Sequence, residues 1–410
     1  MADPYFQTLF ADRIGGAEYG KSTDIYKFEK IKRAKRKALA DCPDRELLDF
    51  GIGENDAMAS ATVREAMARE INQPENRGYA DNGIPEFKQA VTDFMLRQFD
   101  VELDADHEVN HCIGSKTALA MLPLCFINPG DVTLMTVPGY PVAGTHTRYC
   151  GGTVYQMPLL PENDFYPDLK SVPADVVAKA KMMVLNYPNS PTGKVATLAF
   201  YEQVIDFAQR NKIVVVQDAA HLLLTFEGRP LSFLSVPGAK EVGVEVHSLS
   251  KGFNMIGWRL GWVCGNERIV HAFADVKDNC DSGQFIAIQK AGIAALSDPT
   301  IPEQTNSKYR RRLQKLVDTL SRCGFDCKMP GGSYFLYTPA PRGVQDGPTF
   351  ASAEEASQYL ITEQSIVTVP WDDAGAYLRF STTYEAENER AEDALMRETR
   401  ARLAAAKLLF

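Results

Sequence analysis

Residues 213–218 read Ile-Val-Val-Val-Gln-Asp and decide the fold class of this chain of 410 residues. Consecutive β-branched residues favour a strand that is buried on both faces. An amphipathic helical pattern precedes this strand at 197–210, and another apolar run precedes the helix at 181–185. Strand, helix and strand in this order are typical of βαβ units. The sequence therefore predicts an α/β fold with a mostly parallel sheet.

Further apolar runs extend this pattern along the chain. Additional strands are predicted at 132–137, 244–247 and 260–264. A helix is predicted at 62–71, where Thr62 and Glu65 form a capping box. Another is predicted at 85–99, because a proline suits the first turn of a helix.

The last third of the chain has a different character. Residues 307–323 and 385–407 predict helices, whereas 333–338 and 377–382 predict strands. These elements indicate a smaller α+β domain. The basic segment 19–37 is expected to pack near this domain or to bridge the two.

The composition is that of an ordinary globular protein, with 45% hydrophobic and 24% charged residues. The 44 Lys and Arg residues against 53 Asp and Glu residues give a net charge of −9, which argues against a nucleic-acid-binding surface. No apolar run approaches the ~20 residues that span a bilayer. Asp3 and Asp12 interrupt the N-terminal apolar residues, so neither a secretory signal nor a membrane partner is expected.

The eight cysteines include no CxxC pair, and the six histidines include no HExxH pattern. Scattered cysteines in a long chain are typical of free thiols in a reducing compartment. The sequence therefore predicts a cytoplasmic protein that has no disulfide framework and binds no metal.

In an open parallel sheet, ligands bind at the carboxyl ends of the strands. Ser248-Leu249-Ser250-Lys251 follows the predicted strand 244–247, and Gly257-Trp258-Arg259-Leu260-Gly261 comes shortly after it. A lysine in this place can form an imine with an aldehyde cofactor, and Ser248 and Arg259 can hold a phosphate. The alternative is a solvated lysine and a surface arginine. The spacing within a glycine-bracketed stretch disfavours that alternative.

Asp218 ends the strand that decides the fold. A carboxylate in this place can keep a pyridine nitrogen protonated, which makes the ring an electron sink. The alternative is a helix N-cap, which is common after strands of α/β folds. Taken by itself, Asp218 favours the helix N-cap.

Three further segments carry weaker signals. Residues 186–193 (NYPNSPTG) form a rigid loop after a predicted strand, and an amide on such a loop can contact a ring oxygen. Gly114-Ser115-Lys116-Thr117 begins a helical run without the P-loop pattern, and a helix start of this kind binds phosphate. Tyr140 follows the predicted strand 132–137 and can stack on a flat ring. A turn or a capped helix start is the alternative for each.

Arg379 lies within the apolar stretch Tyr377-Leu378-Arg379-Phe380-Ser381. Burying an arginine without a partner is costly. Two partners fit its planar fork: the carboxylate of a substrate, or a structural Asp or Glu.

Taken together, and in this order, these segments resemble the pyridoxal 5′-phosphate (PLP)-dependent aminotransferases of fold type I, class I/II, over roughly residues 51–381. Residues 51–56 (GIGEND), 76–83 (NRGYADNG) and 277–285 (KDNCDSGQF) are most similar to LL-diaminopimelate aminotransferases. The resemblance implies a large domain with a mostly parallel seven-stranded sheet and a smaller α+β domain. The expected division is an N-terminal arm with part of the small domain (1–54), the large domain (55–298) and the small C-terminal domain (299–410).

The resemblance also implies roles for single residues. Lys251 is the residue that bonds the cofactor and moves the proton, and Asp218 is the partner of the pyridine nitrogen. Tyr140 stacks on the ring, and Arg379 binds the α-carboxylate of the substrate. The implied phosphate ligands are Ser115, Lys116, Ser248, Ser250 and Arg259.

Other implied residues lie near the substrate or the partner subunit. Gly53 lies against the substrate, and Tyr5 closes over it. Glu54 is the candidate for the distal ammonium of a diamino dicarboxylic acid, and Lys116 or a residue of the partner subunit is the candidate for its distal carboxylate. Tyr79 reaches the phosphate of the neighbouring subunit, which implies a homodimer with shared active sites.

Two positions depart from the family pattern. The family has Asn directly before Pro-Thr-Gly, where this chain has Ser190, so Asn189 is assigned the contact with the ring oxygen. The family mostly has Tyr three residues after the Asp, where this chain has His221. An imidazole N–H can donate to the same cofactor oxygen, although the histidine side chain is shorter than that of tyrosine.

The expected reaction transfers an amino group from LL-diaminopimelate to 2-oxoglutarate, a step of lysine biosynthesis. An alanine, aspartate or aromatic aminotransferase is the alternative within this class, and a PLP-dependent lyase or decarboxylase on the same fold shares the motifs. A PLP-binding regulatory domain without turnover is disfavoured by the acidic charge and by the lack of a DNA-binding segment.

Overall fold

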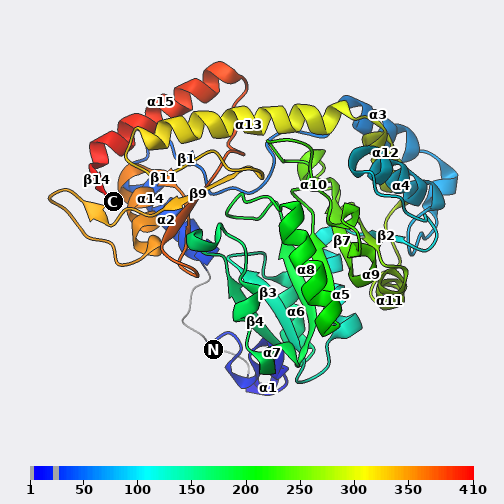
Figure 1. Ribbon diagram of the computed structural model, residues 1–410. Coiled ribbons are helices and arrows are strands. Elements are labelled where there is room, and N and C mark those ends of the chain that lie inside the picture. Colours follow the sequence, from blue (N-terminus) through cyan, green and yellow to red (C-terminus); the bar gives the residue numbers. More distant parts are fainter. Residues whose placement is uncertain (1–3, 22–26) are drawn as a thin grey trace.

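The computed structural model describes residues 4–21 and 27–410, and a seven-stranded sheet forms its centre (Figure 1). The strand order is β2-β8-β7-β6-β5-β3-β4. Strand β8 is antiparallel to both of its neighbours, and the other six strands run in one direction. The predicted α/β class with a mostly parallel sheet is confirmed. The strand bounds are β2 Val109–Cys112, β3 Val132–Val137, β4 Thr153–Pro158, β5 Ala180–Asn186, β6 Val214–Asp218, β7 Gly243–Ser248 and β8 Gly261–Gly265.

Helices cover both faces of this sheet, as the sequence of β6 requires. Val215 packs into the apolar core on one face, and Val216 packs into the core on the other. The first face is covered by α3 Ala61–Glu70, α4 Pro85–Phe99, α8 Leu198–Asn211 and α12 Ile286–Ser297. The second is covered by α5 Ser115–Phe126, α6 Val142–Tyr149 and α11 Glu267–Asp278. Shorter helices are α7 Ala174–Val177, α9 Ala239–Val242 and α10 Leu249–Gly252.

A second group of elements packs around an antiparallel sheet with strand order β12-β13-β9. Its apolar core is separate from that of the large sheet and includes Phe50, Leu313 and Phe380. Figure 1 shows the long helix α13 along the top of the view with α15 against it. The bounds are α2 Lys27–Asp41, β1 Leu48–Asp49, α13 Thr300–Ser321, β9 Phe335–Pro339, β10 Gly343–Val344, α14 Ala353–Gln364, β11 Ile366–Val367, β12 Val369–Trp371, β13 Tyr377–Ser381, α15 Glu389–Ala406 and β14 Leu408–Leu409. Helix α1 Pro4–Gln7 lies at the bottom of the view in Figure 1, away from this group.

Two helix starts differ from the predictions. Helix α3 is capped by Ser60, whose Oγ accepts from the backbone N–H of Val63, so the predicted capping box of Thr62 and Glu65 is wrong. Helix α13 begins at residue 300 instead of 307, because Asp298 Oδ1 accepts from the first N–H at 2.9 Å.

The predicted basic segment 19–37 falls partly on α2. This helix packs its buried Ile31 and Ala34 against Ile361 of α14 and Val369 of β12. Residues 22–26 of the segment lie outside the described residues.

A buried arginine of α13 joins three parts of the chain. Arg312 pairs with Asp56 at 3.1 Å and with Glu392 of α15 at 2.8 Å. It also donates to the backbone carbonyls of Thr382 and Tyr384, at 3.0 and 2.8 Å. Arg312 therefore ties the segment around residue 56 to the chain that follows β13.

We predict that Glu392→Gln lowers the free energy of unfolding by about 3 kcal/mol at neutral pH, because it leaves Arg312 buried without its full countercharge. Burial acts to raise the pKa of Glu392, but hydrogen bonds from Arg311, Arg312 and Lys315 outweigh burial and lower the pKa to about 2. The folded pKa lies below the ordinary value of 4.5, so this stabilisation is present above pH 4.5 and is lost as the pH falls toward 2.

Urea unfolding of both proteins at neutral pH and at about pH 3 measures this effect. The difference in the free energy of unfolding between the wild type and Glu392→Gln should be smaller at about pH 3 than at neutral pH. Asp393→Asn, which changes a half-exposed carboxylate on the same helix whose partner Lys315 keeps its other pair with Glu392, is the control and should cost less than about 1 kcal/mol. An equal difference in the free energy of unfolding at both pH values would contradict the prediction.

Candidate active site

A cavity of about 380 Å³ lies where strands β5, β6 and β7 end. These strands end at Asn186, Asp218 and Ser248, and each of these residues is in the cavity wall. The wall also includes Phe335 of β9 and Arg379 of β13. The volume is in the usual range for small-molecule sites, and the position is the one expected for an open parallel sheet.

Asp218 is a buried carboxylate in this wall. Its Oδ1 accepts from the backbone N–H of Ala220 at 3.1 Å, and the side chain of Asn186 donates to its backbone carbonyl at 3.0 Å. Burial raises the pKa of Asp218 to about 6, although the Ala220 bond and the nearby His247 and Lys251 act in the opposite direction. A positively charged group in the cavity would therefore stabilise the anion.

Lys251 enters the cavity from the short helix α10. Its Nζ donates to the carbonyl oxygen of Gly53 at 3.0 Å and lies 5.4 Å from the ring centre of Tyr334. The side chain of Asn55 donates to the backbone carbonyl of Lys251 at 2.8 Å. Segment 53–55 therefore holds both the backbone and the amine of this lysine.

Donors suited to a phosphate group gather in one part of the wall. Ser115 is the first residue of α5, and it lines the cavity with Ser248, Ser250 and Arg259. Arg259 donates to Ser250 Oγ at 3.2 Å, and it forms no ion pair with any residue that the structure describes. Gly114 makes room for it, since a Cβ there would lie 2.4 Å from the guanidinium. An unpaired guanidinium beside a helix N-terminus is an anion site.

Arg379 is buried and only partly satisfied. It donates to the carbonyl oxygen of Gly51 at 3.1 Å, and its guanidinium carbon lies 4.1 Å from the ring centre of Phe335. Its Nε is buried without a hydrogen-bond partner, and no Asp or Glu of the described residues pairs with it. Burial lowers its pKa to about 10. Of the two partners that the sequence left open, the structural carboxylate is absent from residues 4–21 and 27–410, and a substrate carboxylate fits.

His221 lines the cavity beside the aromatic rings of Tyr334 and Phe335. Its Nδ1 lies 3.2 Å from Ser333 Oγ. Burial, together with the charge of nearby cations, lowers its pKa to about 3. The imidazole is therefore neutral at physiological pH.

Other predicted residues divide into two groups. Gly53, Glu54, Lys116 and Tyr140 line the cavity. Tyr5, predicted to close over the substrate, is 71% exposed and lies outside the cavity wall. Tyr79, predicted to reach the neighbouring subunit, is 86% exposed and also lies outside the cavity wall.

Asn189 does not line the cavity, although the sequence assigned it the contact with the ring oxygen. Its Oδ1 accepts from the backbone N–H of Thr192 at 3.1 Å and from the Thr192 hydroxyl at 2.8 Å, which closes the turn locally. Ser190 and Asn186 take places in the wall instead. The Nδ2 of Asn189 is buried without a hydrogen-bond partner in the described chain.

Sequence reasoning missed several lining residues. Asn186 ends a strand just as Asp218 does, so the same rule could have identified it. Tyr334 and Phe335 open a predicted strand, but apolar residues in a strand carry no sign of a cavity. Phe28 comes from α2, far away in the sequence, and nothing in its local pattern distinguishes it.

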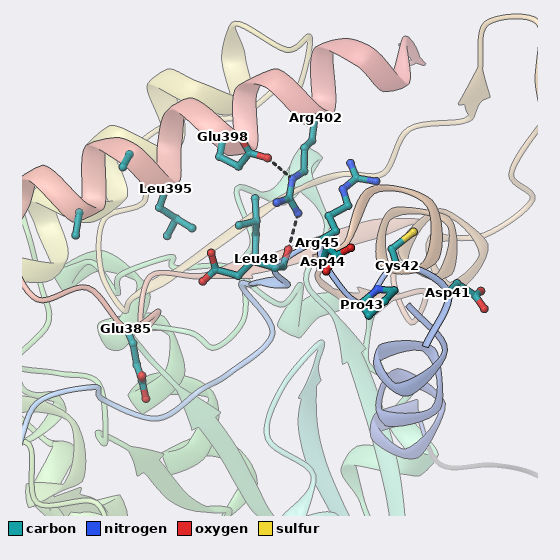
Figure 2. Close-up of a pocket in the computed structure, with 13 residues that line it drawn as sticks. Asp41, Cys42, Pro43, Asp44, Arg45, Leu48, Glu385, Leu395, Glu398 and Arg402 are labelled. Atoms are coloured by element: carbon teal, nitrogen blue, oxygen red, sulfur yellow. Dashed lines mark hydrogen bonds and ion pairs between the residues drawn. The ribbon is translucent and has the colours of Figure 1, made fainter. Parts of the chain in front are cut away.

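A larger hollow of about 920 Å³ lies elsewhere, between α15 and residues 41–48 (Figure 2). Figure 2 shows Arg402 bonded to Glu398, and its guanidinium also donates to the backbone carbonyl of Glu46 at 2.7 Å. No lysine lines this hollow, and its arginines are engaged. The larger hollow therefore lacks the reactive groups that line the smaller cavity at the strand ends.

Two further features of the described chain bear on partners. Within residues 4–21 and 27–410, no three His, Cys, Asp or Glu side chains are grouped so that they could hold a metal ion. In the same ranges, every helix is too short or too polar to cross a bilayer.

The cavity fits one kind of cofactor. It offers a lysine amine for an aldehyde, a buried carboxylate for a pyridine nitrogen, and an unpaired arginine beside a helix N-terminus for a phosphate. Fold and site define a PLP-dependent enzyme of fold type I. Residues 45–395 match the family described as Aminotransferase class I and II, so the chain belongs to the class I and II aminotransferases, and its cofactor is PLP.

Similar proteins span the whole chain. An LL-diaminopimelate aminotransferase of Methanocaldococcus jannaschii is 54% identical, and one of Methanococcus maripaludis is 52% identical, each with 100% of both chains covered. Among solved structures, substrate-bound BacF from Bacillus subtilis has a TM-score of 0.85 at 30% identity and covers 95% of this chain and 97% of its own.

We predict that Asp218→Asn stabilises the cofactor-free protein above pH 6. The folded pKa of Asp218, about 6, lies above the ordinary 3.8, so ionisation opposes folding above pH 6, and this cost is absent below 3.8. The difference between these pKa values corresponds to about 3 kcal/mol. Unfolding by urea at about pH 8 and about pH 4 should show a gain for the variant only at the higher pH.

Added PLP provides the control for this comparison. PLP should raise the melting temperature of the wild type more than that of the variant, because only the wild type offers it a carboxylate. A variant that is less stable at both pH values would contradict the prediction.

Proposed function

We propose that the chain transfers the amino group of LL-diaminopimelate to 2-oxoglutarate and so forms tetrahydrodipicolinate and glutamate, a step of lysine biosynthesis. Two full-length relatives carry the name LL-diaminopimelate aminotransferase at more than half identity. The single structural observation that supports it is Arg379, a buried guanidinium in the cavity wall whose Nε has no partner within the described chain. Such a group requires an anion, and amino and 2-oxo acids both supply a carboxylate.

Lys251 and Asp218 would carry the chemistry. PLP, when bound, acts as an electron sink for the charge that develops at the α-carbon of the substrate. We assign to Lys251 Nζ the bond to the cofactor in the resting enzyme and the removal of the α-proton once substrate is bound. The Gly53 carbonyl directs the amine into the cavity. Asp218 would hold a proton on the pyridine nitrogen, since burial makes its anion dependent on that partner.

The remaining wall residues would position the cofactor. Tyr140 is assigned to stack on the ring, and His221 to face its oxygen. The proposed phosphate ligands are Ser115, Lys116, Ser248, Ser250 and Arg259, all of which line the cavity. Asn189 remains assigned to the ring oxygen: Thr192 engages only its amide oxygen, and its buried Nδ2, the donor that such a contact needs, has no partner within the described chain.

The distal end of LL-diaminopimelate carries an ammonium and a carboxylate. Glu54 and Lys116 line the cavity with exposed side chains, and we assign them to these two groups. Tyr5 lies outside the cavity in the described chain, which gives no support to its role as a cover.

We further propose a homodimer with shared active sites, since fold type I aminotransferases are generally dimeric. Tyr79 would bind the phosphate held by the partner subunit. The exposure of Tyr79, a large aromatic side chain, supports this role.

Two assignments from the sequence complete the proposal. The division into 1–54, 55–298 and 299–410 is supported by the two separate apolar cores, one around each main sheet. A cytoplasmic location is supported by the eight cysteines, all of which are free thiols.

We expect the purified protein to convert LL-diaminopimelate with 2-oxoglutarate at a kcat/KM at least about 100-fold above its values for alanine, aspartate and phenylalanine. Glutamate formation measures the rate. Lys251→Ala should bind PLP without turnover, and its absorbance spectrum should show no conversion to the pyridoxamine form when substrate is added. Good activity on alanine with none on LL-diaminopimelate would reject this substrate but keep the aminotransferase. Turnover by Lys251→Ala would reject the role of that residue.

Arg379→Lys should lower kcat/KM for amino acids by about 100-fold, mainly through KM, because lysine cannot form the paired bonds of the guanidinium with a carboxylate. Initial rates over a range of substrate concentration, with the PLP absorbance spectrum recorded alongside, measure the effect. Arg322→Lys at an exposed site is the matched control. An unchanged KM in the Arg379 variant would contradict the assignment.

A further inference from the structure

Ser333 does not line the cavity, but its hydroxyl contacts His221, which does. Its Oγ lies 3.2 Å from His221 Nδ1, and this is its sole hydrogen-bond contact within the described chain. Ser333 is fully buried, and His221 is nearly so. Because Nδ1 is engaged, Nε2 is the ring nitrogen that is available to a cofactor in the cavity that His221 lines.

The backbone of Ser333 is held in an unfavourable conformation. Its φ of +68° is in the left-handed region, which a residue other than glycine rarely adopts. The N–H of Ser333 donates to the carbonyl of Leu224 at 2.8 Å, and the N–H of Gly332 donates to the carbonyl of Gly193 at 2.9 Å. These bonds fix the position, and glycine would adopt the same φ without strain. A serine here is therefore explained by its hydroxyl.

Hydrogen-bond satisfaction decides the direction of the contact. A neutral imidazole carries its proton on one nitrogen only. If Nδ1 carried it, the buried Ser333 hydroxyl would have no acceptor for its own hydrogen in the described chain, and an unmet buried donor is unfavourable. If Ser333 donates to Nδ1, the proton of the ring lies on Nε2. Lys251 and Arg379, the cations that act on His221, favour the neutral ring.

We propose that Ser333 is a positioning residue that holds His221 in the tautomer with its proton on Nε2, so that an N–H donor points to the ring oxygen of PLP. The proposal rests on PLP binding and on no particular amino-acid substrate. A neutral imidazole can present either a donor or an acceptor to the cofactor. With its proton on Nε2, His221 is a donor, as the tyrosine hydroxyl is that the family mostly has at this position. The hydroxyl of Ser333 favours this tautomer because it donates to Nδ1.

The tautomer can be observed directly. Full-length protein labelled with ¹⁵N-histidine, with and without PLP, is examined by two-bond ¹H–¹⁵N correlation, and His221→Asn assigns the signal among the six histidines. We expect Nε2 to carry the proton in the wild type. A proton on Nδ1 would overturn the proposal, and this result would leave the proposed amino-transfer activity untouched.

Two variants separate the hydroxyl from the backbone. Ser333→Ala removes the hydroxyl and keeps the strained φ, whereas Ser333→Gly removes the hydroxyl and relieves the strain, so the second should be more stable by thermal unfolding. Both variants lack the hydroxyl that fixes the tautomer of His221, so both should raise the pH midpoint of the visible PLP absorbance by about one unit. This is the size expected when one hydrogen bond to a charged oxygen is lost.

A role in backbone structure alone would give a different result. The absorbance midpoint would then stay at the wild-type value in both variants while their stabilities differ, and the proposal would be wrong. Combining Ser333→Gly with His221→Asn should give no shift beyond that of His221→Asn alone, because Ser333 acts through the imidazole. Additive shifts would show that Ser333 acts by another route.

Discussion

The carbonyl oxygen of Gly53 joins the two main parts of the molecule. It accepts from Lys251 Nζ at 3.0 Å, on the side of the large sheet, and from the Tyr334 hydroxyl at 2.7 Å, beside the three-stranded sheet. Neighbouring residues extend the connection, because the carbonyl of Phe50 accepts from the backbone N–H of Ser381 at 2.7 Å. The segment around residue 53 therefore sets the distance between the reactive amine and β13, the strand that carries Arg379.

The charges of the cavity are incomplete within one chain. The structure buries Arg379 with an unsatisfied Nε, leaves Arg259 without a carboxylate in the described residues, and places Asp218 where its ionisation is opposed. Each group is held in place by backbone contacts before any ligand arrives. Such preorganised charges interact strongly with a ligand of opposite charge, since little reorganisation is needed when it binds. An anionic cofactor with a basic ring nitrogen and an anionic substrate meet all three requirements.

Much of the fold and part of the site could be predicted from the sequence. Strand β3 and helix α4 have the bounds predicted for them, and Lys251, Asp218 and Arg259 meet in one cavity. The cofactor contact assigned to Asn189 stays a prediction: Asn189 lies outside the cavity wall, its Oδ1 accepts from Thr192, and its buried Nδ2 has no partner within the described chain. Neighbouring residues of a tight turn point their side chains in different directions, and the pattern of residue types does not indicate these directions.

The sequence by itself determined the order of elements and the chemical groups at the strand ends. These follow from the alternation of apolar and polar residues over a few positions, which is a local property. Only the tertiary structure decided the partners of those groups. Ser333 and His221 are 112 residues apart, and the Lys251 amine meets a carbonyl 198 residues away. Such contacts depend on how two sheets pack against each other, and packing is fixed by the whole chain at once.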